Sequence, residues 1–205
     1  MVAVYPNRRT WASVPIPRRV KYRTIVADPP WPYGRKWNGF SSGRETLQGG
    51  KKSLTTSAIP YPEMTVAAIC DLGVADLATE DAHLYLWTTN KHLWAAREVA
   101  EAWGFTFGQL LTWCKAPMGK GLGDAFSPTA EFVLFCRRGK VRPRSRHDST
   151  WFAGPRAAHS RKPEALQDIA EKVSSGPYLE LFARRKREGW HAWGNEVESD
   201  VELVA

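Results

Sequence analysis

Near its start the chain reads Tyr22-Arg23-Thr24-Ile25-Val26-Ala27-Asp28-Pro29-Pro30-Trp31. Apart from Arg23, the first six of these residues are apolar or β-branched, which predicts a strand over 22–27. The strand must end at Asp28, because the two prolines that follow cannot continue a hydrogen-bonded ladder. The segment therefore places a carboxylate, a rigid turn and a large flat ring at the carboxyl end of a strand.

Strand and helix patterns alternate along the rest of the chain. Helical spacing predicts helices over 65–70, 92–103 and 163–173, the second with Gly104 at its C-cap and the third opened by Pro163. Short apolar runs predict strands over 82–87, 107–113, 131–136, 178–182 and 191–193. Such alternation is typical of an α/β sheet with helices on both faces, in which ligands bind beyond the carboxyl ends of the strands.

The domain organisation follows from length and local composition. Residues 1–20 form a basic, proline-rich arm, read either as a poorly ordered terminus or as a functional arm, and residues 21–205 suit one domain. The irregular loop over 33–57 is long for a compact domain, which favours a functional or mobile loop.

The formal net charge of +8 favours a polyanionic partner, most often nucleic acid. Three separated cysteines and five histidines without paired spacing predict neither a disulfide framework nor a metal site. The sequence has no apolar run long enough to span a bilayer and no signal-peptide core, so we expect a cytoplasmic protein without membrane contact.

The residues at 28–31 suit one kind of chemistry. An exocyclic amine on a purine is a poor nucleophile, because its lone pair is delocalised into the ring. The Asp28 carboxylate and a carbonyl of the Pro29-Pro30 turn could hold the two amine hydrogens, which would aim the lone pair at an electrophile. Trp31 could stack on a base taken out of its helix. The alternative is a proline-stiffened turn without function.

A second feature is the basic run over 137–147, which has six Arg or Lys residues in eleven. We expect Arg142, Arg144 and Arg146 to bind phosphates near the catalytic cleft, positioning nucleic acid without reading its sequence. The alternative is a solvated charged loop.

With these features in order, the chain resembles the mRNA N6-adenosine methyltransferase-like family, in its compact bacterial and phage DNA-type form. The resemblance covers about Arg23 to Glu196. Its segments are Ile25–Trp31, Ile59–Met64, Leu86–Asn90, Trp103–Phe105, Trp113–Lys115, Glu131–Gly139, His159–Glu164, Tyr178–Arg184 and Trp193–Glu196. It implies a Rossmann-like sheet with permuted motif order, S-adenosylmethionine as the methyl donor, and transfer to the N6 amine of adenine.

The resemblance also implies roles for single residues. Asp28, Pro29 and Pro30 would hold the amine, with Asp28 also beside the donor sulfonium, while Trp31 and Tyr61 would line the base pocket. The remaining residues would bind the donor. Lys162 would pair with the donor carboxylate, Arg184, Asn195 and Glu196 would contact its ribose, and Glu180 would either order Arg184 or be a structural carboxylate.

The sequence departs from the family at the basic stretch 185–187 and over 119–128, which leaves some donor and substrate contacts open. A DNA substrate is favoured over RNA, because the chain carries no zinc-finger domain or long extension. The alternatives are an RNA enzyme, an inactive nucleic-acid-binding partner of an active enzyme, and methylation of the cytosine amine. A monomer and a homodimer are both compatible with the sequence.

Overall fold

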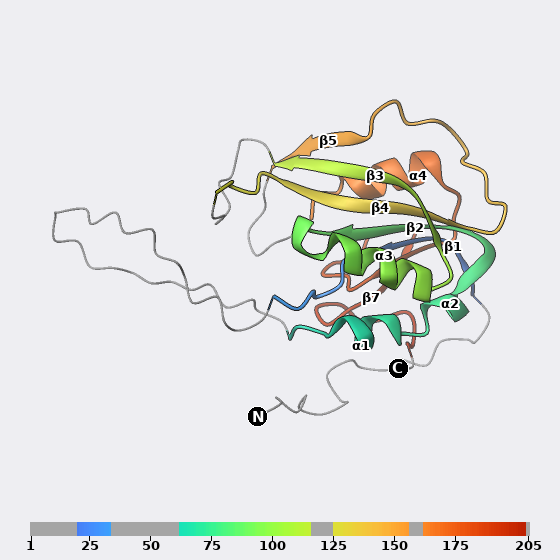
Figure 1. Ribbon diagram of the computed structural model, residues 1–205. Coiled ribbons are helices and arrows are strands. Elements are labelled where there is room, and N and C mark those ends of the chain that lie inside the picture. Colours follow the sequence, from blue (N-terminus) through green and yellow to red (C-terminus); the bar gives the residue numbers. More distant parts are fainter. Residues whose placement is uncertain (1–19, 34–61, 116–124, 156–161, 204–205) are drawn as a thin grey trace, which may run out of the picture.

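The computed structural model describes residues 20–33, 62–115, 125–155 and 162–203 (Figure 1). Their strands form one seven-stranded sheet in the order β5-β3-β4-β2-β1-β6-β7. In chain order the strands are β1 (Tyr22–Ala27), β2 (Ala78–Thr88), β3 (Thr106–Lys115), β4 (Ala130–Arg138), β5 (Trp151–Gly154), β6 (Tyr178–Leu181) and β7 (Trp190–Trp193). The helices are α1 (Val66–Cys70), α2 (Val74–Leu77), the 3-10 turn η1 (Asn90–His92), α3 (Leu93–Ala102) and α4 (Ala165–Val173).

Strand direction places the carboxyl end of β1 at a topological junction. β1 pairs in parallel with β2 on one side and with β6 on the other, whereas β4 runs antiparallel to both β2 and β3. After β1 the chain first builds the β2 side of the sheet and later returns through α4 to β6. In open α/β sheets such a change of winding direction leaves a crevice for ligands at the carboxyl ends of the strands. Asp28 lies at this junction.

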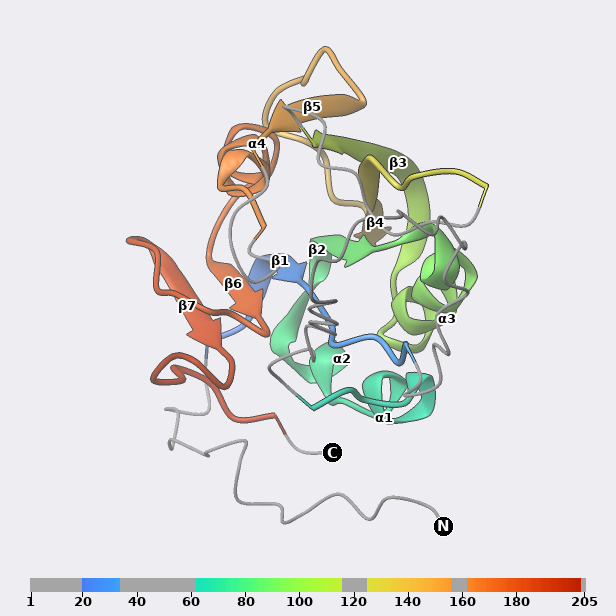
Figure 2. The ribbon, with the colours of Figure 1, turned by 90° about the vertical axis from the view of Figure 1, so that its left-hand side faces the viewer.

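Helices cover both faces of the sheet, as the sequence predicted (Figure 2). Ile25 and Ala27 belong to the cluster beneath α1 and α3, and Val26 between them belongs to the cluster beneath α4. The same alternation separates Leu86 from Trp87 on β2. β1 is therefore buried from both sides, which explains its continuous apolar sequence.

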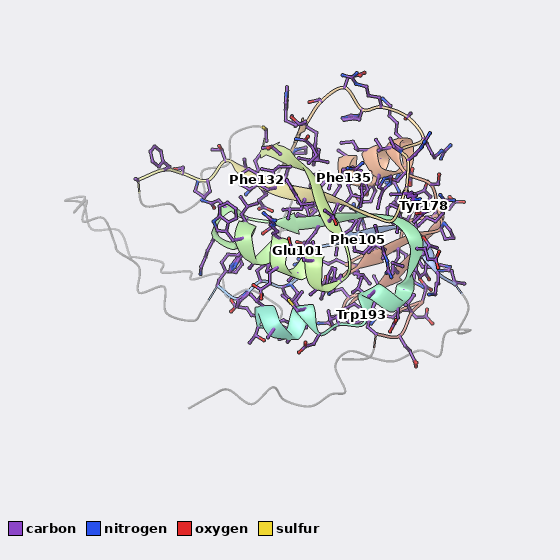
Figure 3. All side chains as sticks on the ribbon, turned by 45° about the vertical axis from the view of Figure 1, so that its right-hand side comes forward. Glu101, Phe105, Phe132, Phe135, Tyr178 and Trp193 are labelled. Atoms are coloured by element: carbon purple, nitrogen blue, oxygen red, sulfur yellow. The ribbon has the colours of Figure 1, made fainter. Side chains whose placement is uncertain are left out.

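Aromatic side chains fill both layers of the core. Figure 3 shows Phe135 and Tyr178 on one side, and Phe105 and Trp193 lower in the molecule. Tyr178 and Phe135 pack in the cluster beneath α4, whereas Phe105 and Trp193 belong to the other cluster. The sequence has ten tryptophans, and six of those in the described residues are buried, so tryptophan serves packing in large part.

The predicted helices and strands are all present, with shifted ends. The strand predicted over 82–87 begins earlier, at Ala78, and the helix expected to open at Pro163 begins at Ala165. Gly104 has a φ of 81° after α3, which confirms the predicted C-cap. α2, η1 and β5 were not predicted. The 1–20 arm, except Val20, lies outside the described residues, and none of the described helices is long and apolar enough to cross a membrane.

Candidate active site

The turn after β1 is fixed by backbone hydrogen bonds. The Asp28 N–H donates to the carbonyl of Leu181 at 3.4 Å, which joins the turn to the end of β6. The Trp31 N–H donates to Pro29 and the Met64 N–H to Pro30, both at 2.9 Å. A carbonyl oxygen has two lone pairs, so each proline carbonyl keeps one for a further donor.

A chain of alternating charges begins at Asp28. The Lys162 ammonium lies 2.9 Å from each oxygen of the Asp28 carboxylate and 3.3 Å from Glu131. Glu131 in turn pairs with Lys115 at 2.8 Å. The sheet brings these residues together, because Lys115 ends β3 and Glu131 lies near the start of the antiparallel β4. Lys162 also lies over the Trp87 ring, 5.4 Å from its centre.

Burial and these charges act in opposite directions on the two carboxyl groups. Burial raises the pKa of Asp28 above its ordinary value, although Lys162 acts to lower it. Burial also acts to raise the pKa of Glu131, but Lys162 and Lys115 outweigh it and the pKa is lowered. The Lys162 ammonium therefore favours the ionised form of both carboxyl groups against the effect of burial.

Trp31 does not present the open face that was expected for base stacking. Its side chain is only 3% exposed, its ring stacks on His92 with centroids 5.6 Å apart, and its indole N–H donates to the Trp87 carbonyl at 3.0 Å. These two contacts connect the turn to η1 and to the end of β2. The accessible ring nearby belongs to Tyr33, which is 38% exposed and packs edge-on against His92.

A pocket opens beside Asp28, lined by Pro30, Phe182, Ala183, Arg184, Asn195 and Glu196. Arg184 and Glu196 form an ion pair across it at 3.6 Å. Gly194 lies so close to the Ala183 backbone that a Cβ there would overlap it, so glycine is required where the two loops meet. The pocket thus brings together Asp28, Arg184, Asn195 and Glu196, four of the residues that the sequence assigned to the donor.

A second pocket also has Asp28 in its wall, together with Trp87, Lys162, Glu180, Phe182, Arg184 and Arg185. Glu180 accepts a hydrogen bond from Gln167 on α4, and its burial raises its pKa. Phe182 lines both pockets and has a φ of 62°, which is rare for a non-glycine residue and is found more often at functional sites.

The basic run is not beside this site. It begins at Arg137 and Arg138, which pair with His83 and Ala82 of β2 and so lead toward the amino end of that strand, while Asp28 follows the last residue of β1. Further on, the Arg144 N–H donates to Val173 at the end of α4. The antiparallel direction of β4 carries the run, with Arg142, Arg144 and Arg146, away from the catalytic end of the sheet, so its expected position near the cleft is wrong.

Sequence reasoning missed four residues at the site: Lys115, Glu131, Tyr33 and Phe182. Lys115 and Glu131 belong to segments that carry the family resemblance. A charged residue at the end of each of these apolar strands could have indicated a functional role. Tyr33 could have been noticed as a second aromatic residue after the prolines. Nothing in the sequence indicates that the backbone of Phe182 has a positive φ. Tyr61 lies outside the described residues.

Comparisons with known proteins point to one family. The family model for MT-A70 matches residues 22–196. The chain is 32% identical to the Type II methyltransferase M.MunI of Mycoplasma sp, over 92% of this chain and 83% of that protein. It is 30% identical to the N6-methyladenosine RNA methyltransferase MTA1 of Cryphonectria parasitica, covering 84% of this chain and 51% of that one. It is 29% identical to the human N(6)-adenine-specific methyltransferase METTL4, over 87% of this chain and 38% of that protein. The match spans both the Asp28 turn and the residues that line the two pockets, and the chain belongs to the MT-A70 family.

Proposed function

We propose that this protein transfers a methyl group from S-adenosylmethionine to the N6 amine of adenine in DNA. The observation that carries the proposal is the Asp28 carboxylate, which lines both pockets and is held by Lys162 at 2.9 Å. A carboxylate in this place can accept from an amine in one direction and face a cationic donor in the other.

The residues of the first pocket fit the nucleoside part of the donor. Glu196 can accept from ribose hydroxyls, and Arg184 and Asn195 can donate to ribose and ring acceptors. Lys162 and Arg185, at the second pocket, can attract the carboxylate of the donor's amino-acid part. The pockets adjoin at Asp28, Phe182 and Arg184, so one extended molecule could occupy both. When bound, S-adenosylmethionine supplies a methyl group on a cationic sulfur.

Asp28 and the proline turn position the nucleophile. The Asp28 carboxylate accepts one amine hydrogen and the carbonyl of Pro29 or Pro30 accepts the other, which turns the nitrogen lone pair toward the methyl carbon. As the new C–N bond forms and the C–S bond breaks, the bonding pair stays on sulfur and the nitrogen becomes positive. Burial raises the pKa of Asp28, so this carboxylate is better able to accept the released proton than an exposed one.

DNA is proposed as the substrate because the compact chain spans most of a bacterial Type II methyltransferase but only about half of an RNA-modifying relative. Arg142, Arg144 and Arg146 are exposed. Within the part of the chain that the structure describes, only Arg146 of the three has an acidic partner, Asp148 at 3.4 Å. We propose that they bind phosphates of the same nucleic acid at a distance from the target adenine, outside the catalytic cleft.

The test is a competition in one tube. Equal amounts of duplex DNA, single-stranded DNA and RNA of the same sequence are incubated with the protein and labelled S-adenosylmethionine, and the nucleosides are separated by mass spectrometry. The proposal predicts N6-methyldeoxyadenosine as the main product. If N6-methyladenosine is the only product, the substrate is RNA and not DNA. A methylcytosine product would overturn the assignment of the adenine amine as the methyl acceptor.

A further inference from the structure

Two exposed aromatic rings lie at the catalytic end of the sheet. Trp94, in the first turn of α3, is 78% exposed, and Tyr33 follows the proline turn. Both residues come directly after strands that end at this edge, Tyr33 after β1 and Trp94 after β2 with η1 between. A tryptophan exposed to this degree contributes little to the core, so packing does not explain it.

Lys91 contacts Tyr33 and precedes Trp94 by one helical turn. Its ammonium donates to the Tyr33 carbonyl at 2.9 Å and lies 5.4 Å from the centre of the Tyr33 ring. Lys91 and Trp94 are three residues apart across η1 and α3, a spacing that places side chains on the same side of a helical segment. The surface formed by Tyr33, Lys91 and Trp94 is called the aromatic rim below.

His92 anchors the rim to the catalytic turn. It is buried between Trp31, on which it stacks, and Tyr33, whose ring meets it at an interplanar angle of 85°. Tyr33 is also close enough to the site for Asp28, Glu131 and Lys162 to influence its hydroxyl. The rim therefore has a fixed position relative to Asp28.

The reaction demands such a surface. The amine of an adenine inside a helix cannot reach a carboxylate at the bottom of a crevice, so the base must leave its stack, and its neighbours lose a stacking partner. Exposed aromatic rings restore that stacking for any base, and a nearby cation meets the backbone between the bases. The rim combines both features at the correct end of the sheet, whereas the basic run lies at the opposite end.

We propose that the aromatic rim binds the strand that carries the target adenine, with Trp94 and Tyr33 stacking on flanking bases and Lys91 near a phosphate. The inference rests on the proposed function, because it takes nucleic acid as the substrate. It adds a substrate-binding surface that lies outside both pockets.

The test measures binding of a fluorescein-labelled, adenine-rich single-stranded 20-mer by anisotropy, at several salt concentrations. Trp94→Ala should weaken binding about fivefold or more, because one stacked base is lost, and Trp94→Phe should restore most of the affinity. The salt dependence of Trp94→Ala should stay parallel to that of the wild type, because no charge is removed. Lys91→Gln should instead reduce the log–log salt slope by about 0.7.

Phe107→Ala is the matched control. Phe107 is 42% exposed near the start of β3, level with Leu84 of β2, whereas the catalytic turn follows the last residues of β1. Its loss should leave oligonucleotide affinity unchanged, and donor affinity should be unchanged in every variant. Equal affinity of Trp94→Ala and wild type would overturn the inference, as would an equal loss in Phe107→Ala. If wild type neither binds nor methylates nucleic acid, the proposed function itself fails.

Discussion

Replacing Lys162 by glutamine should shift the pH dependence of methyl transfer. The substitution removes the cation that lies 2.9 Å from both Asp28 oxygens and leaves Asp28 near Glu131, a second carboxylate that already acts to raise its pKa. The pKa of Asp28, raised by burial, should rise further. Because the ionised form holds the amine, less of the enzyme should be active at neutral pH, and activity should recover as the pH increases.

The magnitude follows from the geometry. Unit charges 2.9 Å apart attract by about 6 kcal/mol at an effective dielectric constant of about 20, but most of this is offset by desolvation. A hydrogen bond to a charged group keeps a net value of about 1.5–3 kcal/mol, which corresponds to a roughly ten- to hundredfold lower kcat/KM near pH 7.

The assay is kcat/KM for methyl transfer between pH 5.5 and 9.5, measured for wild type, Lys162→Gln and Lys162→Arg. Lys162→Arg keeps the charge and should retain an acid limb close to that of the wild type. Lys140→Gln removes an exposed cation on the turn after β4, at the opposite end of the sheet, and should change nothing. A Lys162→Gln profile that is lower at every pH but has the same acid limb would refute the electrostatic link to Asp28.

Three further predictions concern the donor, the fold and the basic run. Asn195→Ala should weaken S-adenosylmethionine binding several-fold in calorimetry, because it removes a polar group from the first pocket; unchanged affinity would move the donor elsewhere. Burial, together with the charges of Arg137 and Arg23, lowers the pKa of His83 in the folded protein to about 4. Between about pH 6.5 and 4, His83 is therefore protonated in the unfolded chain but not in the folded protein. Stability should therefore be lost as the pH falls through this window, by on the order of 3 kcal/mol, and denaturant titrations of His83→Gln should show a flatter dependence than wild type. Neutralising Arg142, Arg144 and Arg146 together should reduce the salt slope for duplex DNA by about 0.9 per lost phosphate contact while donor affinity stays constant, whereas parallel slopes would indicate a solvated loop.

Local patterns were sufficient for most of the fold. The apolar run of β1 and the helical spacing of α3 each contain their own signal, because burial imposes a period on the sequence. β5 gave no such signal: only Phe152 of its four residues is buried, and the strand exists because it pairs with the edge of β3. α2, with four residues, is too short to show a helical period.

Site residues that are adjacent in sequence were predicted, whereas those brought together by the topology of the sheet were missed. Asp28 and its prolines are adjacent in sequence, so their joint role could be inferred directly. Glu131 joins Lys162 only because β4 runs antiparallel, and the same direction takes Arg142 away from the cleft. Residue type alone could not show that Trp31 is buried against His92 while Tyr33 is accessible.

The most direct measurement is single-turnover methyl transfer to DNA by Asp28→Ala beside wild type, with detection of N6-methyldeoxyadenosine and a melting curve for each protein. Lys162 keeps Glu131 as a partner at 3.3 Å, so the variant should melt close to wild type. We expect its rate to fall far below a tenth of the wild-type rate, since no neighbour replaces the acceptor at the amine. A normally folded variant that keeps more than about a tenth of the rate, a barrier change below about 1.4 kcal/mol, would contradict the assignment of Asp28 to the reacting centre.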